Sequence, residues 1–114
     1  MRDDALDRSF SALADRTRRG VVEMLRNAPA RAGALAERLD VSPPALTRHL
    51  RVLRESGIVE EVGDDADARV SIYRLRGDGL ARLQQWVDDV QAMWHDQLAS
   101  FAAHVKKTRT RSRP

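Results

Sequence analysis

Leucines recur at helical spacing along the stretch VSPPALTRHLRVLRES, residues 41–56. Leu50 and Leu53 lie within about 40° of Leu46 on a helix that turns by about 100° per residue. The opposite side carries Pro44, Arg48, Arg51 and Glu55. The pattern predicts a short helix with a narrow buried stripe and a basic exposed face. Helices that read the major groove of DNA have this pattern, and so do ordinary amphipathic helices with a solvated arginine face.

Residues that favour helix starts mark three of the predicted helices. Ser42 is a favoured N-cap, and Pro43 takes the first helical position, where its missing N–H costs nothing. Asp15 opens an earlier helix, and Asp3 or Asp4 opens a shorter one before it.

A further helix is predicted over about 32–39, directly before the stretch 41–56. Asp40 lies where the chain must turn, and aspartate tolerates the left-handed conformation better than most residues. Two short helices joined by about three residues, the second with an exposed basic face, are typical of a helix-turn-helix.

The hydrophobic pattern changes after Gly57, which ends the fourth helix. Residues 58–62 and 70–75 favour β-structure, and residues 63–69 between them are polar. This pattern predicts a hairpin with a rather long loop. We therefore expect a mainly α fold with a β-hairpin wing: a winged helix-turn-helix with four helices, two strands and a last helix.

The last predicted helix runs from about 78 to near 105 and is long for so small a domain. Its apolar positions recur at spacings of three, four or seven, and Trp86, Met93, Leu98 and Val105 widen the apolar surface. We expect this helix to pair with its symmetry mate and with the first helix in a homodimer, the alternative being that it folds back over its own core. The expected dimer interface comprises Leu6, Phe10, Leu83, Val87, Val90, Trp94 and Phe101.

Charge is distributed unevenly along the 114 residues, which carry a net charge of +3. Five of the 20 basic residues lie in KKTRTRSRP at 106–114, and all 17 acidic residues precede it. We expect residues 1–105 to form one DNA-binding and dimerisation domain. The basic tail, 106–114, is expected to be disordered, or to add non-specific attraction to phosphate.

Several classes of protein are disfavoured by composition. The chain has no cysteine, so it has no disulfide, thiolate metal ligand or thiol nucleophile. No glycine-rich phosphate loop or catalytic triad spacing stands out, so we expect no enzyme. No apolar run is long enough to span a membrane and the start is unlike a signal peptide, so a cytoplasmic protein is expected.

Three arginines, Arg16, Arg18 and Arg19, fall in the first turn of the second helix, where the helix dipole disfavours cations. Either a nearby carboxylate or phosphate compensates them, or they are exposed to solvent.

Taken together, these segments resemble the ArsR/SmtB family of winged-helix repressors. The resemblance covers about residues 9–105 and is most specific in ALADRTRRGVVEML at 12–25, LAERLDVSPPALTRHLRVLRESGIVE at 35–60 and RVSIYRL at 69–75. It implies a homodimer that binds an inverted-repeat operator on double-stranded DNA. It also implies that a bound effector relieves repression.

Site residues follow from the resemblance position by position. Those matching the DNA-contacting part of the recognition helix are Ser42, Pro44, Ala45, Thr47, Arg48 and His49, with Arg51 on the same exposed face. Arg69 matches the basic residue of the wing. Arg48 is the best candidate for a bidentate guanine contact, and Thr47 for a thymine methyl or a phosphate. His49 lies at the edge of the buried face, which favours a structural or phosphate role over base readout.

The chain departs from the metal-sensing members of the family. Where these carry Cys-x-Cys, this chain has Arg31 and Gly33. The last helix offers Asp88, Asp89, His95 and His104, whose spacing does not match the family's second metal site. We therefore expect no metal and no cofactor. A small-molecule effector of unknown identity could lie among Trp86, Met93, Trp94 and Phe101, although such residues more commonly form core or interface.

Two further departures affect the expected DNA contacts. Pro44 stands where the family often has a polar reader such as glutamine. The wing has a cluster of acids that we expect only Arg69 to oppose, which would keep its tip out of the groove. These acids are Glu60, Glu61, Asp64, Asp65 and Asp67. The sequence thus favours a dimeric DNA-binding repressor, with a winged-helix protein–protein interaction module that has lost operator binding as the alternative.

Overall fold

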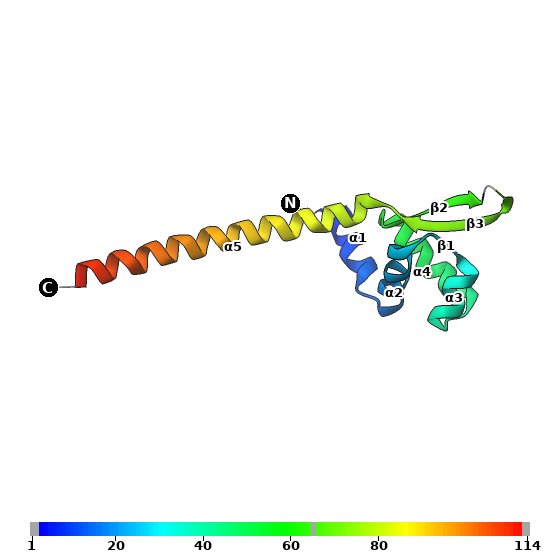
Figure 1. Cartoon of the computed structure of the whole chain (residues 1–114), viewed down its shortest axis with the longest axis horizontal. Coiled ribbons are helices and arrows are strands. Elements are labelled where there is room, and N and C mark those ends of the chain that lie inside the picture. The colour runs from blue at the N-terminus through cyan, green and yellow to red at the C-terminus, as the bar shows by residue number, and fades with distance from the viewer. Residues whose placement is uncertain (1–2, 65, 113–114) are drawn as a thin grey trace. The chain divides into compact units, whose positions relative to one another are not determined.

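The computed structural model describes residues 3–64 and 66–112, without the side chains at 64, 67, 68 and 109–112. It is mainly helical with a small antiparallel sheet, as expected (Figure 1). The helices are α1 (Asp4–Leu13), α2 (Arg16–Asn27), α3 (Ala32–Leu39), α4 (Pro43–Glu55) and α5 (Gly77–Ser112). The strands are β1 (Ala30–Arg31), β2 (Val59–Asp64) and β3 (Asp67–Leu75). The chain divides into two compact units, 1–83 and 84–114, and the boundary lies within α5, so the first unit includes that helix as far as Leu83.

Side-chain caps fix the predicted helix starts. The Asp3 carboxylate accepts a hydrogen bond from the Leu6 N–H at 3.0 Å, and Asp15 accepts one from the Arg18 N–H at 3.0 Å. The Ser42 hydroxyl oxygen accepts one from the Ala45 N–H at 3.3 Å. Each cap satisfies an N–H group that has no partner within the helix, so these three predictions are confirmed.

The turn between α3 and α4 depends on the left-handed backbone of Asp40, at φ 54° and ψ 49°. Its N–H donates to the Glu37 carbonyl at 3.2 Å, and the Val41 N–H donates to the Ala36 carbonyl at 3.1 Å. These bonds satisfy carbonyls at the end of α3 and reverse the chain within three residues, so α4 begins at once.

The core of the first unit is built around the leucines of α4. Leu46, Leu50 and Leu53 are each no more than 2 % exposed, as the helical spacing predicted. They pack in one cluster with apolar side chains from α1, α2, α3 and the sheet, among them Ala12, Val21, Leu25, Leu35, Ile58 and Tyr73. Full burial of a leucine is worth about 1.5–3 kcal/mol, so this cluster fixes which face of α4 remains outside.

The sheet differs from the predicted hairpin in two ways. Strand β1 was not expected; it pairs antiparallel with β3, through Ala30 opposite Tyr73, to give the order β1-β3-β2. The predicted loop over 63–69 is wrong, because β2 continues to Asp64 and β3 begins at Asp67, with a register irregularity between Gly63 and Asp64. Pairing across the hairpin outweighs the low β-propensity of these glycine and aspartate residues.

Helix α5 is longer than expected. It continues to Ser112, so the prediction that the helix ends near Val105 is wrong. No glycine or proline interrupts the sequence between Val105 and Arg113, and lysine and arginine are good helix formers that suit the C-terminal end of a helix dipole. Among the described residues, no helix combines the length and apolar character needed to cross a membrane.

We expect Gly79→Ala to destabilise the first unit by about 1–3 kcal/mol, the usual cost of overpacking. Gly79 is buried, and a Cβ there would lie 2.5 Å from the Ser56 carbonyl oxygen and 2.7 Å from Ile58 Cγ1. Gly77 is the matched control, because a Cβ there meets nothing within 4 Å. Urea unfolding of both variants measures the difference, and equal stability of the two would contradict this account.

Candidate nucleic-acid interface

The exposed face of α4 begins at its capped N-terminus. Pro44, Thr47, Arg48 and Arg51 are exposed there with Ser42, while Ala45 and His49 are half-buried at its edge. Thr47 donates its hydroxyl proton to the Pro43 carbonyl at 2.9 Å, within its own helix. The side chain is thereby held in one rotamer, and its hydroxyl proton is already used.

Arg48 and Arg51 make no hydrogen bond or ion pair within the part of the chain that the structure describes. Arg54, one turn further along the helix, instead donates from Nη1 to Glu61 Oε2 at 2.6 Å. The basic side of α4 is thus divided. Its last arginine is attached to the wing, and the two before it remain available to an external anion.

The base of the wing is less acidic than we expected. Glu61 is paired with Arg54, and Glu60 accepts from Arg74 Nε at 2.5 Å. The expectation that only Arg69 opposes the acids is therefore wrong for Glu60 and Glu61, since strand register places Arg74 beside Glu60 and packing places Arg54 beside Glu61. Arg69 is exposed on β3. Asp65 and the side chains of Asp64 and Asp67 lie outside the described residues.

Tyr73 is a buried residue of the central strand, β3. It pairs with Ala30 of β1 on one side and Glu61 of β2 on the other. Burial raises the pKa of the Tyr73 hydroxyl, and the nearby negative charge of Glu61 raises it further. The Tyr73 side chain is therefore neutral, and it is buried close to the Arg54–Glu61 pair.

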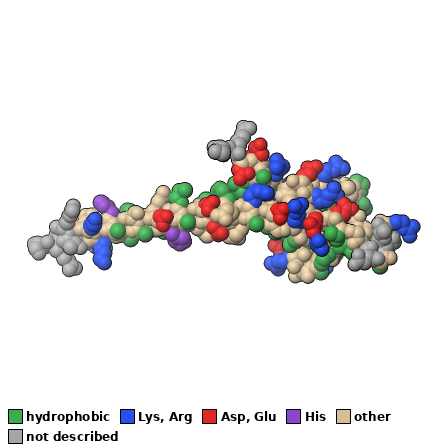
Figure 2. Space-filling model, turned by 90° about the horizontal axis from the view of Figure 1, so that it is seen from above, with side chains coloured by type: hydrophobic (Ala, Val, Ile, Leu, Met, Phe, Trp, Pro, Cys, Tyr) green, Lys and Arg blue, Asp and Glu red, His purple; other side chains and the backbone are tan. Residues whose placement is uncertain are grey.

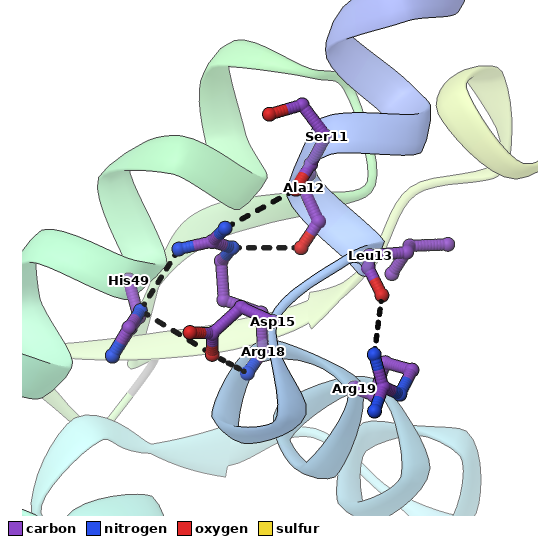
Figure 3. Close-up of polar contacts among 7 residues, drawn as sticks. All are labelled: Ser11, Ala12, Leu13, Asp15, Arg18, Arg19 and His49. Atoms are coloured by element: carbon purple, nitrogen blue, oxygen red, sulfur yellow. Dashed lines mark hydrogen bonds and ion pairs between the residues drawn. The ribbon is translucent and has the colours of Figure 1, made fainter.

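Two of the arginines in the first turn of α2 bind the end of α1 (Figure 3). Arg18 donates from Nε to the Ala12 carbonyl at 2.7 Å and from Nη2 to the Ser11 carbonyl at 3.1 Å. Arg19 donates from Nη1 to the Leu13 carbonyl at 2.9 Å. Backbone carbonyls are partners that we did not expect for these two arginines, and Arg16, the third of the group, is exposed. Carbonyls at a helix C-terminus lack partners and carry partial negative charge, so they compensate these cations.

His49 lies beside the same guanidinium group. Its Nδ1 is 3.1 Å from Arg18 Nη1 and 3.9 Å from Asp15 Oδ1, and its side chain is 23 % exposed (Figure 3). Because a guanidinium can only donate, a hydrogen bond between these two groups requires Nδ1 of His49 to be the acceptor. His49 therefore contacts α2 from the edge of α4's exposed face, a link that sequence spacing alone could not show.

Comparisons with known proteins agree with this geometry. A family model described as a helix-turn-helix domain matches residues 13–62. The HTH-type transcriptional regulator Rv2034 of Mycobacterium tuberculosis is 38 % identical over 96 residues, which cover 84 % of each chain. The ArsR-like transcriptional regulator from Rhodococcus sp. RHA1 is 31 % identical, with a TM-score of 0.76 over 91 % of this chain and 93 % of that one. This chain belongs to the ArsR family of winged helix-turn-helix transcriptional regulators.

A shorter similarity concerns a repressor. The transcriptional repressor SdpR of Bacillus subtilis is 31 % identical over 52 residues, 46 % of this chain and 58 % of SdpR. These relatives are described as regulators of transcription rather than as enzymes. The ArsR-family resemblance proposed from the sequence is thus confirmed, for a chain that has no cysteine.

Most of the residues expected at a dimer interface are exposed apolar side chains. Trp94 and Phe101 on α5 are 57 % and 66 % exposed, and Val87, Val90 and Leu98 are also exposed. Phe10 on α1 is exposed as well, while Leu6 and Leu83 are half-buried. In the space-filling view, green apolar side chains appear at intervals along α5 (Figure 2). So much exposed apolar surface on one helix indicates a contact surface.

The acids of α5 that were considered as metal ligands are engaged locally. Gln84 Nε2 donates to Asp88 Oδ1 at 2.9 Å, and Gln85 Nε2 donates to Asp89 Oδ1 at 2.8 Å. Among the side chains that the structure describes, no cluster of three or more His, Cys, Asp or Glu has a geometry that could hold a metal ion.

We expect Asp15 to contribute to stability in a pH-dependent way. The hydrogen bond from the Arg18 backbone N–H, with help from nearby positive charge, lowers the pKa of the Asp15 carboxyl below its ordinary value of 3.8. A lowered pKa gives stability that is present above the unfolded-state value and is lost as the pH falls through the folded-state value.

Chemical denaturation of Asp15→Ala and Asp15→Asn tests this point. Asp15→Ala should cost about 0.5–2 kcal/mol at pH 7 because the cap is lost. Asp15→Asn keeps the cap, so its loss at pH 7 should be smaller and its stability should vary less between pH 5 and pH 2 than that of the wild type. If Asp15→Asn and wild type gave parallel pH profiles, the carboxylate would have no such role.

Proposed function

We propose that this ArsR-family regulator is a homodimeric repressor that binds an inverted-repeat DNA operator. The observation that carries the proposal is the pair Arg48 and Arg51, which are exposed on a tightly capped helix and make no hydrogen bond or ion pair with the described residues. Arginine presents a planar set of donors that suits guanine edges and phosphates. An exposed, unpaired pair on the second helix of a helix-turn-helix is where such ligands would bind.

Each residue of the exposed face has a proposed role. Arg48 makes the bidentate guanine contact, and Arg51 binds phosphate. Thr47 contacts a thymine methyl group, since its hydroxyl proton is used by the Pro43 carbonyl and its own methyl group remains for an apolar contact. Ser42, Pro44 and Ala45 approach the backbone at the capped end, and Arg69 approaches phosphate from the wing.

The homodimer is proposed from the apolar surface of α5 together with α1. Leu83, Val87, Val90, Trp94 and Phe101 lie within an arc of about 60° around the helix, so one partner can cover them all. Homodimers commonly join the same surface of both subunits about a two-fold axis. Two recognition helices in such a dimer would meet half-sites about 34–36 Å apart, which is one helical turn of DNA.

The effector that relieves repression is proposed to be something other than a metal. The resemblance places the Cys-x-Cys pair of metal-sensing members at Arg31 and Gly33, which offer no such ligand. The spacing of Asp88, Asp89, His95 and His104 does not match the family's second metal site.

Removing the Arg48 guanidinium should weaken specific DNA binding. We expect Arg48→Ala to raise the Kd for the selected operator by about 5- to 150-fold, equivalent to the 1–3 kcal/mol of a bidentate base contact. Arg26→Ala removes the same charge from α2 and should have little effect on Kd. Arg26 is exposed there, with its Nη2 3.9 Å from Glu23 Oε2. The operator is first selected from random duplexes with wild-type protein, and Kd is measured by fluorescence anisotropy. Equal loss in both variants would favour the protein-interaction alternative.

An acidic side chain in the apolar stripe should break the dimer. Sedimentation equilibrium should show that Trp94→Glu raises the dimer dissociation constant by at least about 10-fold, because a carboxylate would be buried without a partner. Ala92→Glu adds the same charge at a position about 160° from Trp94 around the helix, and it should leave the dimer intact. A dimer that survives Trp94→Glu, or that is lost equally in Ala92→Glu, would rule out this stripe as the interface.

A further inference from the structure

One guanidinium group joins three helices. Arg18, on α2, binds the Ser11 and Ala12 carbonyls at the end of α1 and lies 3.1 Å from Nδ1 of His49 on α4 (Figure 3). Its own backbone N–H is held by the Asp15 cap at 3.0 Å. The donors of a guanidinium lie in one rigid plane. If the α1 carbonyls shift and the guanidinium of Arg18 moves with them, the position of its Nη1 relative to His49 also changes.

The position of His49 gives this contact a consequence for the recognition face. His49 follows Arg48 and comes two residues before Arg51, and it sits at the boundary between the buried leucines and the exposed arginines. The leucine stripe holds α4 through apolar contacts, which have little directional preference. A hydrogen bond at the flank is directional and sets the rotation of α4 about its own axis.

We propose that Arg18 and His49 form a positioning pair that couples α1 to the recognition helix. Arg18 does not contact DNA in this proposal; it acts through His49 on the direction in which Arg48 and Arg51 point. Because α1 also carries Leu6 and Phe10 of the proposed dimer interface, a change at that interface reaches α4 through the same guanidinium. The inference rests on the proposed DNA-binding function and adds a route by which dimer geometry affects operator affinity.

Arg19 provides a matched control. It follows Arg18 on the same helix turn and binds the next α1 carbonyl, that of Leu13 at 2.9 Å. Among the described residues it makes no hydrogen bond or ion pair with α4. Arg18→Gln and Arg19→Gln therefore both remove one positive charge and weaken the attachment of α1. Only Arg18→Gln also removes the contact with the recognition helix.

The first measurement is affinity for a duplex selected by wild-type protein, compared with a random duplex of equal length. Arg18→Gln should weaken specific binding by about 10-fold relative to Arg19→Gln, the loss expected for one hydrogen bond to a charged group. The two variants should bind the random duplex alike, since phosphate attraction depends on total charge.

Variants of His49 test whether the two residues act as one unit. His49→Leu should lose as much specific affinity as Arg18→Gln, and His49→Asn, which offers an acceptor near the position of Nδ1, should regain part of it. The double variant Arg18→Gln/His49→Leu should be no weaker than either single variant, because both changes remove the same contact. Additive losses, or equal loss in Arg18→Gln and Arg19→Gln, would overturn the proposal and leave Arg18 with a purely structural role.

A measurement without DNA separates this inference from the proposed function. Backbone amide NMR shifts of residues 42–51 should change in Arg18→Gln and stay near wild type in Arg19→Gln. If wild-type protein selected no duplex, the DNA-binding proposal would fail, while this comparison would still decide whether Arg18 positions α4. Unchanged shifts in Arg18→Gln would refute the positioning role even if operator binding were demonstrated.

Discussion

Burial of a single leucine stripe on α4 is the interaction on which the rest of the first unit depends. Leu46, Leu50 and Leu53 belong to one cluster with apolar side chains from α1, α2, α3 and the sheet, and their burial decides which side of α4 faces outward. The Ser42 cap and the left-handed turn at Asp40 start the helix at one residue, so the stripe cannot shift along the chain. Arg48 and Arg51 are exposed because they lie on the side of α4 opposite the buried leucines.

The arginines of this chain differ in function because they differ in neighbours. Arg18 and Arg19 compensate carbonyls at the end of α1, and Arg54 and Arg74 form ion pairs with glutamates of β2. Exposed ion pairs of this kind contribute little to stability, about 0–1 kcal/mol each, but they do reduce the charge at the wing base. The wing that the sequence showed as acidic is thus partly neutralised where it joins α4.

The surface of α5 extends the same reasoning beyond one chain. A helix whose large apolar side chains are exposed along successive turns cannot gain stability from its own core, and it is stabilised when a partner covers that surface. In the proposed dimer this helix would set the distance between recognition helices, while the contacts of Arg18 would relate α1 to α4. The proposed dimer interface and the recognition face of α4 would then share no residue and would be connected through side-chain contacts.

The sequence by itself determined the features that arise within a few residues of one another. Helix starts at Asp3, Asp15 and Ser42, the turn at Asp40 and the leucine spacing are local, because a cap or a helical face involves neighbours three or four positions away. The ArsR-family resemblance also followed from local motifs in order. Tertiary structure alone decided the β1 pairing, the short hairpin loop, the neutralised wing glutamates and the Arg18–His49 contact. In each of these cases the partners are at least seven positions apart or meet only through strand register, so no local period or propensity encodes them.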